Sequence, residues 1–153
     1  MTRRGMTACR GASMALYAVF IATVGVPLLA ATVDLSRVWV KKAELANAVE
    51  AACSAYANTP DAKVFLEQGR TVLGAEARSE GMRLFGYNMP EGGALTGMTY
   101  AMEESAGLAQ VTATCSGSAS IRPVIFAGIY SFELRKTVTV KAKYGTPGNW
   151  VAN

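Results

Sequence analysis

The stretch that decides the fold is GASMALYAVFIATVGVPLLAATV, residues 11–33, which runs for 23 residues without a charged side chain. A helix of that length rises about 34 Å, and the hydrocarbon core of a bilayer is about 30 Å thick. We therefore expect one transmembrane helix here. Arg3, Arg4 and Arg10 precede it with no acid among them, and this bias favours a cytoplasmic N-terminus.

A cleaved secretory signal would share the basic start and the apolar run, and it would release a soluble secreted protein. Its apolar region normally covers only about 7 to 15 residues, and the best exit sequence here, Leu29-Ala30-Ala31, has Leu where a small residue is needed. Apolar residues also continue beyond the span at helical spacing. They are Leu35, Val38, Trp39, Leu45, Val49, Ala52, Cys53 and Tyr56. We therefore favour an uncleaved anchor that continues into an amphipathic stem over residues 34–58.

The charge balance argues against nucleic acid as a partner. The chain has 153 residues, with 15 Lys and Arg against 11 Asp and Glu. Three of these cations lie within residues 1–10, so 12 cations face 11 acids in the remainder. A nearly neutral domain cannot gain affinity by releasing counterions from a polyanion. We expect a cytoplasmic basic tail over residues 1–10, the transmembrane helix over 11–33, and one periplasmic or extracellular domain over 34–153.

Beyond the stem, the pattern predicts a second helix over residues 60–85. It should start with Pro60 at the first helical position and Asp61 in the first turn. Three glycines should leave it short, broken or mobile, because each costs about 1 kcal/mol against Ala. These are Gly69, Gly74 and Gly81. Residues 87–97 are rich in turn-forming residues and predict a loop.

From Met98 onward the apolar period changes from helical to two, which predicts strands over residues 98–103, 109–115 and 137–144. A hairpin loop over 104–107 should join the first two. The segment 121–134 is too short to span a membrane and too apolar for a free loop. It predicts a buried crossover helix, with a helix on the membrane surface as the alternative. The expected class is α+β, with the stem packed on a small, mainly antiparallel three-stranded sheet.

The residue types argue against catalysis. The chain contains no histidine, which removes Ser-His and Cys-His nucleophile pairs and the commonest metal ligand. No glycine-rich phosphate loop follows a predicted strand, and the three cysteines form no CxxC pair. We therefore predict that the protein is not an enzyme, with no catalytic residue, no cofactor, no metal and no small-molecule substrate.

Small residues recur along one face of the span at spacings of three and four, which allows another helix to approach closely. They are Gly11, Ala15, Ala18, Ala22 and Gly25. The same composition also occurs in membrane helices without a partner. Pro27 removes one backbone hydrogen bond and should bend the helix.

Cys53 falls on the apolar stripe of the stem, and Cys115 falls on the inward face of the second strand. Both side chains should therefore point into one core. An oxidising compartment favours a disulfide between them, and closing a loop of about 60 residues contributes about 4 kcal/mol in the chain-entropy model. The alternative is two buried free thiols. Cys9, in the basic tail, should stay reduced.

Four motifs give residues 10–57 a resemblance to the TadE/TadG-like family of tight-adherence (Flp) pilus assembly proteins. In this sequence they read Arg10-Gly11-Ala12, Pro27-Leu28-Leu29, Asp34-Leu35-Ser36-Arg37, and Glu44-Leu45-Ala46-Asn47-Ala48 followed by Ala51-Ala52. Glu50 stands where the family usually has Asp. The positions that carry the match outside the span are Asp34, Arg37, Leu45, Asn47 and Ala48.

The resemblance implies a pilin-like layout and a role as a minor pilin, a pseudopilin or a membrane-anchored assembly factor. Its partners would be the membrane and other pilins or assembly proteins, contacted through the transmembrane helix. Processed members are cut after a Gly that is followed by Glu five residues on, which points to Gly11 and Ala12; here Leu16 holds the Glu position. Both a cut and a full-length chain therefore stay open. A membrane-tethered periplasmic binding module unrelated to pili is the alternative function.

Overall fold

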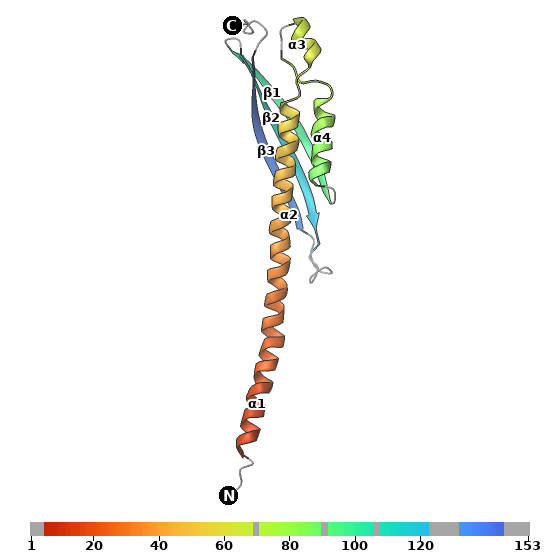
Figure 1. Ribbon diagram of the computed structural model, residues 1–153. Helices are drawn as coiled ribbons and strands as arrows, with labels where there is room; N and C mark the ends of the chain where they lie inside the picture. Colours follow the sequence, from red (N-terminus) through yellow and green to blue (C-terminus); the bar gives the residue numbers. More distant parts are fainter. Residues whose placement is uncertain (1–4, 69–70, 90–91, 106–107, 123–131, 146–153) are drawn as a thin grey trace.

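The computed structural model describes residues 5–68, 71–89, 92–105, 108–122 and 132–145. Figure 1 shows one long helix that projects well beyond a small sheet, with the N-terminus at the far end of the projection. The sheet and two short helices gather around the other half of this helix. The α+β layout predicted from the sequence is therefore confirmed.

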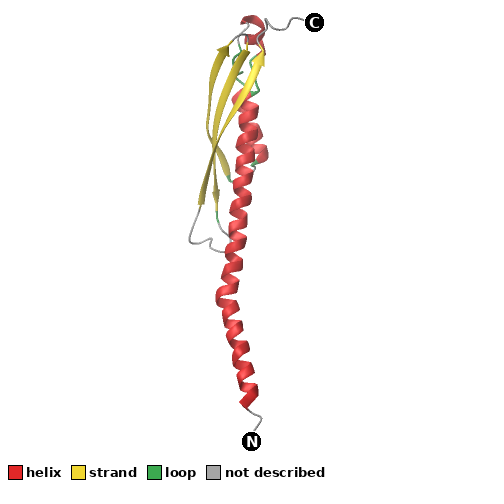
Figure 2. Ribbon diagram, turned by 90° about the vertical axis from the view of Figure 1, so that its left-hand side faces the viewer, coloured by secondary structure: helices red, strands yellow, loops and turns green. Residues whose placement is uncertain are grey.

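The long helix consists of α1 (Gly5–Phe20), the π-helical turn η1 (Ile21–Gly25) and α2 (Val26–Ala57). In η1 the backbone N–H of Val26 donates to the carbonyl of Ile21, five residues back. Pro27 follows immediately, and a proline ring crowds the carbonyl four residues before it. A wider turn relieves this crowding, so the irregularity predicted at Pro27 lies just ahead of it. The helix continues unbroken through this turn in both views (Figures 1 and 2).

The second helix predicted over residues 60–85 is two short helices, α3 (Ala62–Gln68) and α4 (Ala77–Asn88). The prediction of a broken helix is confirmed, but its predicted start at Pro60 is wrong. Asp61 caps α3 instead, because its Oδ1 accepts the backbone N–H groups of Lys63 at 3.0 Å and Val64 at 3.1 Å. Pro60 forms an isolated β-bridge with Leu73, which holds the segment between the helices against the end of α2.

The sheet contains β1 (Gly93–Ser105), β2 (Leu108–Ile121) and β3 (Phe132–Gly145) in the order β1-β2-β3, and both pairs are antiparallel. Cys115 pairs with Met98 on one side and Val138 on the other, so all three lie on one face, as the period of two predicts. Ser105 pairs with Leu108, which puts the first hairpin where the sequence predicts it.

All three strands are longer than predicted, and at three of their ends the extension is five or six residues. β1 begins at Gly93, inside the predicted loop over residues 87–97. β2 runs to Ile121 and β3 starts at Phe132, so both ends of the predicted crossover helix are strand, and that prediction is wrong there. The rest of that segment, residues 123–131, lies outside the described residues. The period-two signal fades after Cys115 because the inward positions that follow are small, at Gly117 and Ala119.

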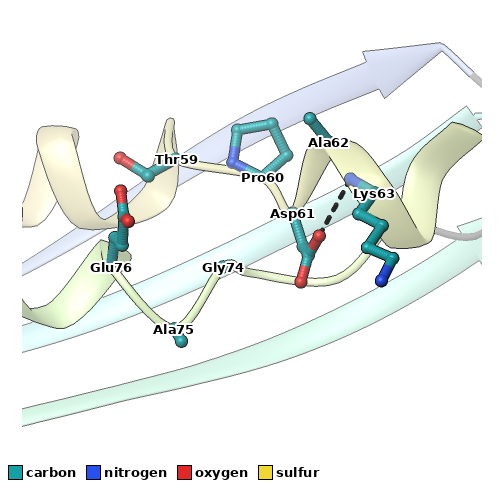
Figure 3. Close-up of a pocket in the computed structure, with 8 residues that line it drawn as sticks. All are labelled: Thr59, Pro60, Asp61, Ala62, Lys63, Gly74, Ala75 and Glu76. Atoms are coloured by element: carbon teal, nitrogen blue, oxygen red, sulfur yellow. Dashed lines mark hydrogen bonds between the residues drawn. The ribbon is translucent and has the colours of Figure 1, made fainter.

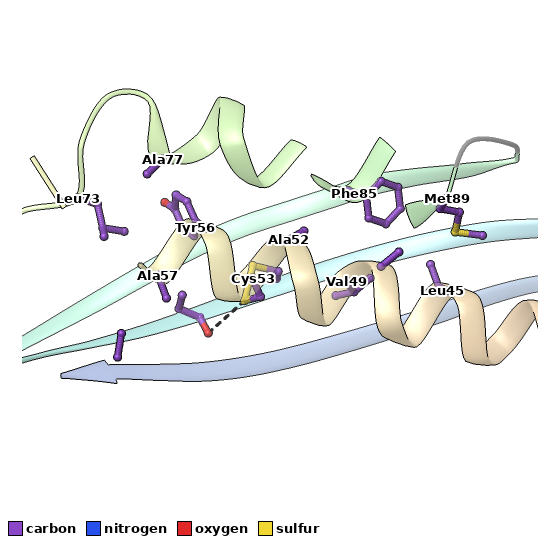
Figure 4. Close-up of a cluster of buried hydrophobic side chains, with 14 of the residues drawn as sticks. Leu45, Val49, Ala52, Cys53, Tyr56, Ala57, Leu73, Ala77, Phe85 and Met89 are labelled. Atoms are coloured by element: carbon purple, nitrogen blue, oxygen red, sulfur yellow. Dashed lines mark hydrogen bonds between the residues drawn. A yellow bond between two sulfur atoms is a disulfide. The ribbon is translucent and has the colours of Figure 1, made fainter. Parts of the chain in front are cut away.

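The core lies between the distal half of α2 and one face of the sheet, with α4 packed along α2 at the side (Figures 1 and 2). Figure 4 shows α2 and β2 meeting along this seam. The buried side chains on α2 include Leu45, Ala48, Val49, Ala52, Cys53, Tyr56 and Ala57. Those on β2 are Ala109, Val111, Ala113, Cys115 and Ala119.

Only part of the predicted apolar stripe on the stem is covered. Leu45 is 1% exposed, whereas Leu35 is 57% and Trp39 is 64% exposed. The sheet therefore covers the distal turns of the stripe and leaves its first turns exposed. The reason is geometric, because the three strands lie along only the distal part of α2 (Figure 2).

Two glycines of α4 give a matched test of how closely α4 approaches α2. A Cβ on Gly81 would lie 2.5 Å from Cε of Met98 and 3.0 Å from the carbonyl oxygen of Ala52, whereas a Cβ on Gly86 would meet nothing within 4 Å. Gly81→Ala should therefore lower the free energy of unfolding by about 1 to 3 kcal/mol. Gly86→Ala should raise it by up to about 1 kcal/mol, because Ala is the better helix former. Equal effects in thermal unfolding followed by circular dichroism would contradict this packing.

Candidate functional site

The proximal half of the long helix exposes its apolar side chains on every side. Fourteen large hydrophobic residues between Met14 and Val40 are exposed, and Met14 (77%) and Leu16 (73%) are the most exposed of them. Among the described residues, the helix over Ser13–Ala57 is the one that is long and apolar enough to cross a membrane, judged by length and composition. An unpartnered apolar surface of this size marks a membrane or protein contact.

The small-residue face of the span lies within this exposed region. Ala15, Ala18 and Ala22 are exposed, and Gly25 is half-buried. Among the described residues, a Cβ on Gly25 would meet only the Ile21 side chain of the same helix, at 3.7 Å. Gly11 and Ala12 lie in α1, but their side chains are outside the described set. Helix packing through this face and cleavage after Gly11 stay predictions.

The motif residues outside the span divide into two groups. Leu45 and Ala48 are buried in the seam against the sheet, so they serve packing within the domain. Arg37 and Asn47 are exposed. Asp34 is only 7% exposed and takes part in interactions, although its neighbours along the helix are exposed. The motif thus combines positions that fix α2 on the sheet with polar positions at the exit from the apolar stretch.

A covalent bridge joins the stem to the middle of the sheet. Cys53 of α2 and Cys115 of β2 form a disulfide with Cα atoms 5.5 Å apart, and both residues are fully buried (Figure 4). Sγ of Cys53 also lies 3.5 Å from the Ala113 carbonyl oxygen and 3.6 Å from that of Val138. A disulfide sulfur has no proton to donate, so these are packing contacts in the bridged form and become hydrogen bonds only in a thiol.

A second link ties the distal end of α2 to β3. The hydroxyl of Tyr144 donates a hydrogen bond to the backbone carbonyl of Ala57. Burial raises the pKa of Tyr144, so its hydroxyl remains protonated and able to donate throughout the neutral range. The disulfide and this bond together fix the helix on the sheet at two levels.

A pocket of about 340 Å³ at the distal tip carries two carboxylates but no assembled chemistry (Figure 3). Its Asp61 is engaged in capping α3, and Gly74 donates its backbone N–H to the Thr59 carbonyl at 3.0 Å. Over the part of the chain that the structure describes, no three Cys, Asp or Glu side chains are grouped to hold a metal ion. The pocket follows from the connection between α3 and α4.

Sequence reasoning missed a larger groove at the opposite end of the domain. It has a volume of about 790 Å³ and lies between residues 33–44 of α2 and residues 120–122 at the end of β2. Its lining combines the apolar Val33, Val40 and Ile121 with Arg37 and Arg122. The groove exists because β2 continues past Cys115 to Ile121. The sequence shows no clear sign of this continuation, because the inward-facing residues after Cys115 are small.

The chain was compared with protein families, curated proteins and solved structures. The model of the Tad family, described as Flp pilus-assembly TadE/G-like, matches residues 11–59. No curated protein and no solved structure matches. The matched region begins with the exposed apolar helix and ends where α2 gives way to the segment before α3. Over residues 11–59 this chain is thus similar to the TadE/G-like Flp pilus-assembly family.

Proposed function

We propose that this chain is a non-catalytic component of a tight-adherence type pilus or of a related secretion machine, acting as a minor pilin, a pseudopilin or a membrane-anchored assembly factor. The observation that carries the proposal is one continuous helix whose exposed apolar half and domain-bound half both fall within the family match. Such a helix can hold a small domain at a fixed distance from the membrane while its proximal half packs against other helices. Nothing in this role requires a reacting group.

The proposed topology places the N-terminus in the cytoplasm and the domain in the periplasm or outside the cell. Two features support it. Arg3, Arg4 and Arg10 form a basic end before the apolar stretch, and cations are retained on the cytoplasmic side. The disulfide between Cys53 and Cys115 suits an oxidising compartment. The anchor lies in the inner membrane in this scheme, and the domain follows it outward.

A reporter fusion tests the topology. Alkaline phosphatase is active only after export, so a fusion placed after Asn153 should be active, and a matched fusion after Arg10 should be inactive. The expected activities differ by at least about tenfold, because one reporter is exported behind the span and the other lacks the span. An inactive fusion after Asn153, present at a normal protein level, would put the domain in the cytoplasm and refute the proposed topology.

Surface pili test the function together with the small-residue face. Deleting the gene should abolish pili, and the parent chain should restore them. Ala18→Leu combined with Ala22→Leu should restore about tenfold fewer, because the added side chains hold partner helices apart and close packing contributes about 1 to 2 kcal/mol. Phe20→Leu, on the opposite face of the same helix, is the control and should restore pili fully.

The deletion strain tests the pilus role, and the double Leu variant tests the small-residue face separately. If the deletion strain keeps its pili, the role in pilus assembly is wrong, and a membrane-tethered binding module becomes the better account. If the deletion strain loses its pili but the double Leu variant restores them fully, the pilus role stands and the small residues do not mediate packing. Counting pili by electron microscopy, with immunoblots to match protein levels, distinguishes these results.

A further inference from the structure

The groove beside α2 combines two kinds of surface. One part is apolar, with Val33 and Val40 more than half exposed on α2 and Ile121 at the end of β2. The other part is basic, with Arg37 and Arg122 exposed on the two elements that form its walls. Its volume of about 790 Å³ lies within the range of about 300 to 1,000 Å³ that small-molecule sites occupy. The groove therefore suits a ligand that has an anionic part and an apolar part.

The charges of the groove are not cancelled within the described part of the chain. Lys41 forms an ion pair with Glu44 at 2.9 Å, and this pair uses the one acid of the lining. Among the described residues neither Arg37 nor Arg122 forms an ion pair, and both are exposed. Two guanidinium groups remain, and a guanidinium binds a phosphate through paired N–H groups. The groove thus carries a net positive charge that complements a phosphate.

The position of the groove indicates where that phosphate comes from. The groove starts at Val33, where the uncharged stretch ends, and continues for about three turns of α2. Trp39 lies in this part of the helix with the ammonium group of Lys42 over its ring, 5.5 Å from the centroid. An indole together with long cationic side chains is typical of the level where lipid headgroups meet water. At this level the abundant phosphates belong to phospholipids.

We propose that the groove between α2 and the end of β2 binds an anionic phospholipid. Arg37 and Arg122 hold the phosphodiester and any further anionic headgroup, and the acyl chains leave along Val33 toward the exposed span. Because the two arginines come from the helix and from the sheet, the bound lipid fixes the height and tilt of the whole domain relative to the membrane. The proposal does not depend on the pilus role.

Fluorescence quenching of a tryptophan placed in the groove measures the lipid that is bound there. Trp39 is not part of the groove lining, so the full-length protein carries Val40→Trp in a background of Trp39→Phe and Trp150→Phe, which removes both native tryptophans. It is reconstituted into phosphatidylcholine vesicles that contain an equal minor fraction of brominated phosphatidylglycerol or brominated phosphatidylcholine. Near physiological salt, diffuse attraction between exposed charges fades beyond about 8 Å, whereas a ligand held in the groove persists.

The parent should prefer phosphatidylglycerol over phosphatidylcholine by about 25-fold, because each of the two arginines changes the affinity for an anionic membrane by about fivefold. The double variant Arg37→Gln, Arg122→Gln should lower the ratio of phosphatidylglycerol to phosphatidylcholine binding to about one. The double variant Arg37→Lys, Arg122→Lys keeps both charges and should keep most of the preference. Lys141→Gln with Lys143→Gln removes the same charge from exposed positions toward the distal end of β3 and should leave the ratio unchanged. Equal quenching by the two lipids in the parent would overturn the proposal, and so would an equal loss in both Gln variants. An intact disulfide on a non-reducing gel verifies folding.

Discussion

Replacing Cys115 by Ala is expected to lower the free energy of unfolding of the domain by about 4 kcal/mol. The disulfide joins residues 62 positions apart, and a loop of that length removes about this much entropy from the unfolded chain in the chain-entropy model. Typical small domains have only about 5 to 15 kcal/mol in total. The variant should therefore unfold at a clearly lower denaturant concentration in mild detergent.

Comparing single and double variants shows whether the loss of stability comes from the disulfide itself or from the two side chains. Cys53→Ala, Cys115→Ala and the double variant should lose about the same amount, because one covalent link is lost in each case. Adding reductant to the parent should cause the same loss, and Cys9→Ala should cause none. The opposite result would be a small loss of stability in each single variant, the sum of the two in the double variant, and no response to reductant. It would mean that both residues are free thiols.

Replacing Leu45 by Ala should cost about 2 to 5 kcal/mol, the usual range for a fully buried Leu. Leu45 is 1% exposed, and its Cδ1 comes within 3.4 Å of the place where a Cβ on Gly117 would lie, so α2 and β2 pack there without spare room (Figure 4). The cavity left by the truncation cannot be closed by moving the helix, because the disulfide holds it two turns further along.

Leu66→Ala provides the matched control, because Leu66 is 80% exposed on α3. This change should alter stability by less than about 0.5 kcal/mol. Denaturant unfolding of the two variants, followed by far-UV circular dichroism, measures the difference. If both variants unfold at the same denaturant concentration, the seam between α2 and the sheet does not support the domain as described.

Long patterns made the outline of the fold predictable. The charge-free stretch over residues 11–33 predicted a membrane-length helix, the apolar stripe beyond it predicted the stem, and alternation predicted three strands and the faces that they bury. The stripe and the alternation together placed Cys53 and Cys115 in one core, where the structure joins them. Each of these conclusions rests on a periodicity that many residues repeat.

Features that depend on contacts between distant segments were not predictable. The strand ends at Ile121 and Phe132 follow from pairing with each other, which no local pattern reveals. The exposure of Leu35 and Trp39 depends on where the sheet stops along α2. The basic groove needs Arg37 and Arg122, which are far apart in sequence and meet only because β2 extends beyond its clear alternation.

The measurement that tests the central claim most directly is the intact mass of the chain, isolated from the membranes of its own cells without reductant. The central claim is that residues 13–57 form one helix, anchored in the membrane at its proximal half and bridged to an exported domain at its distal half. The account predicts a membrane-bound chain that retains the span, beginning at its first residue or after Gly11. Its mass should be two hydrogens below that of the reduced form. A soluble chain that starts beyond Ala31, or a membrane-bound one in which Cys53 and Cys115 are both free, would contradict it.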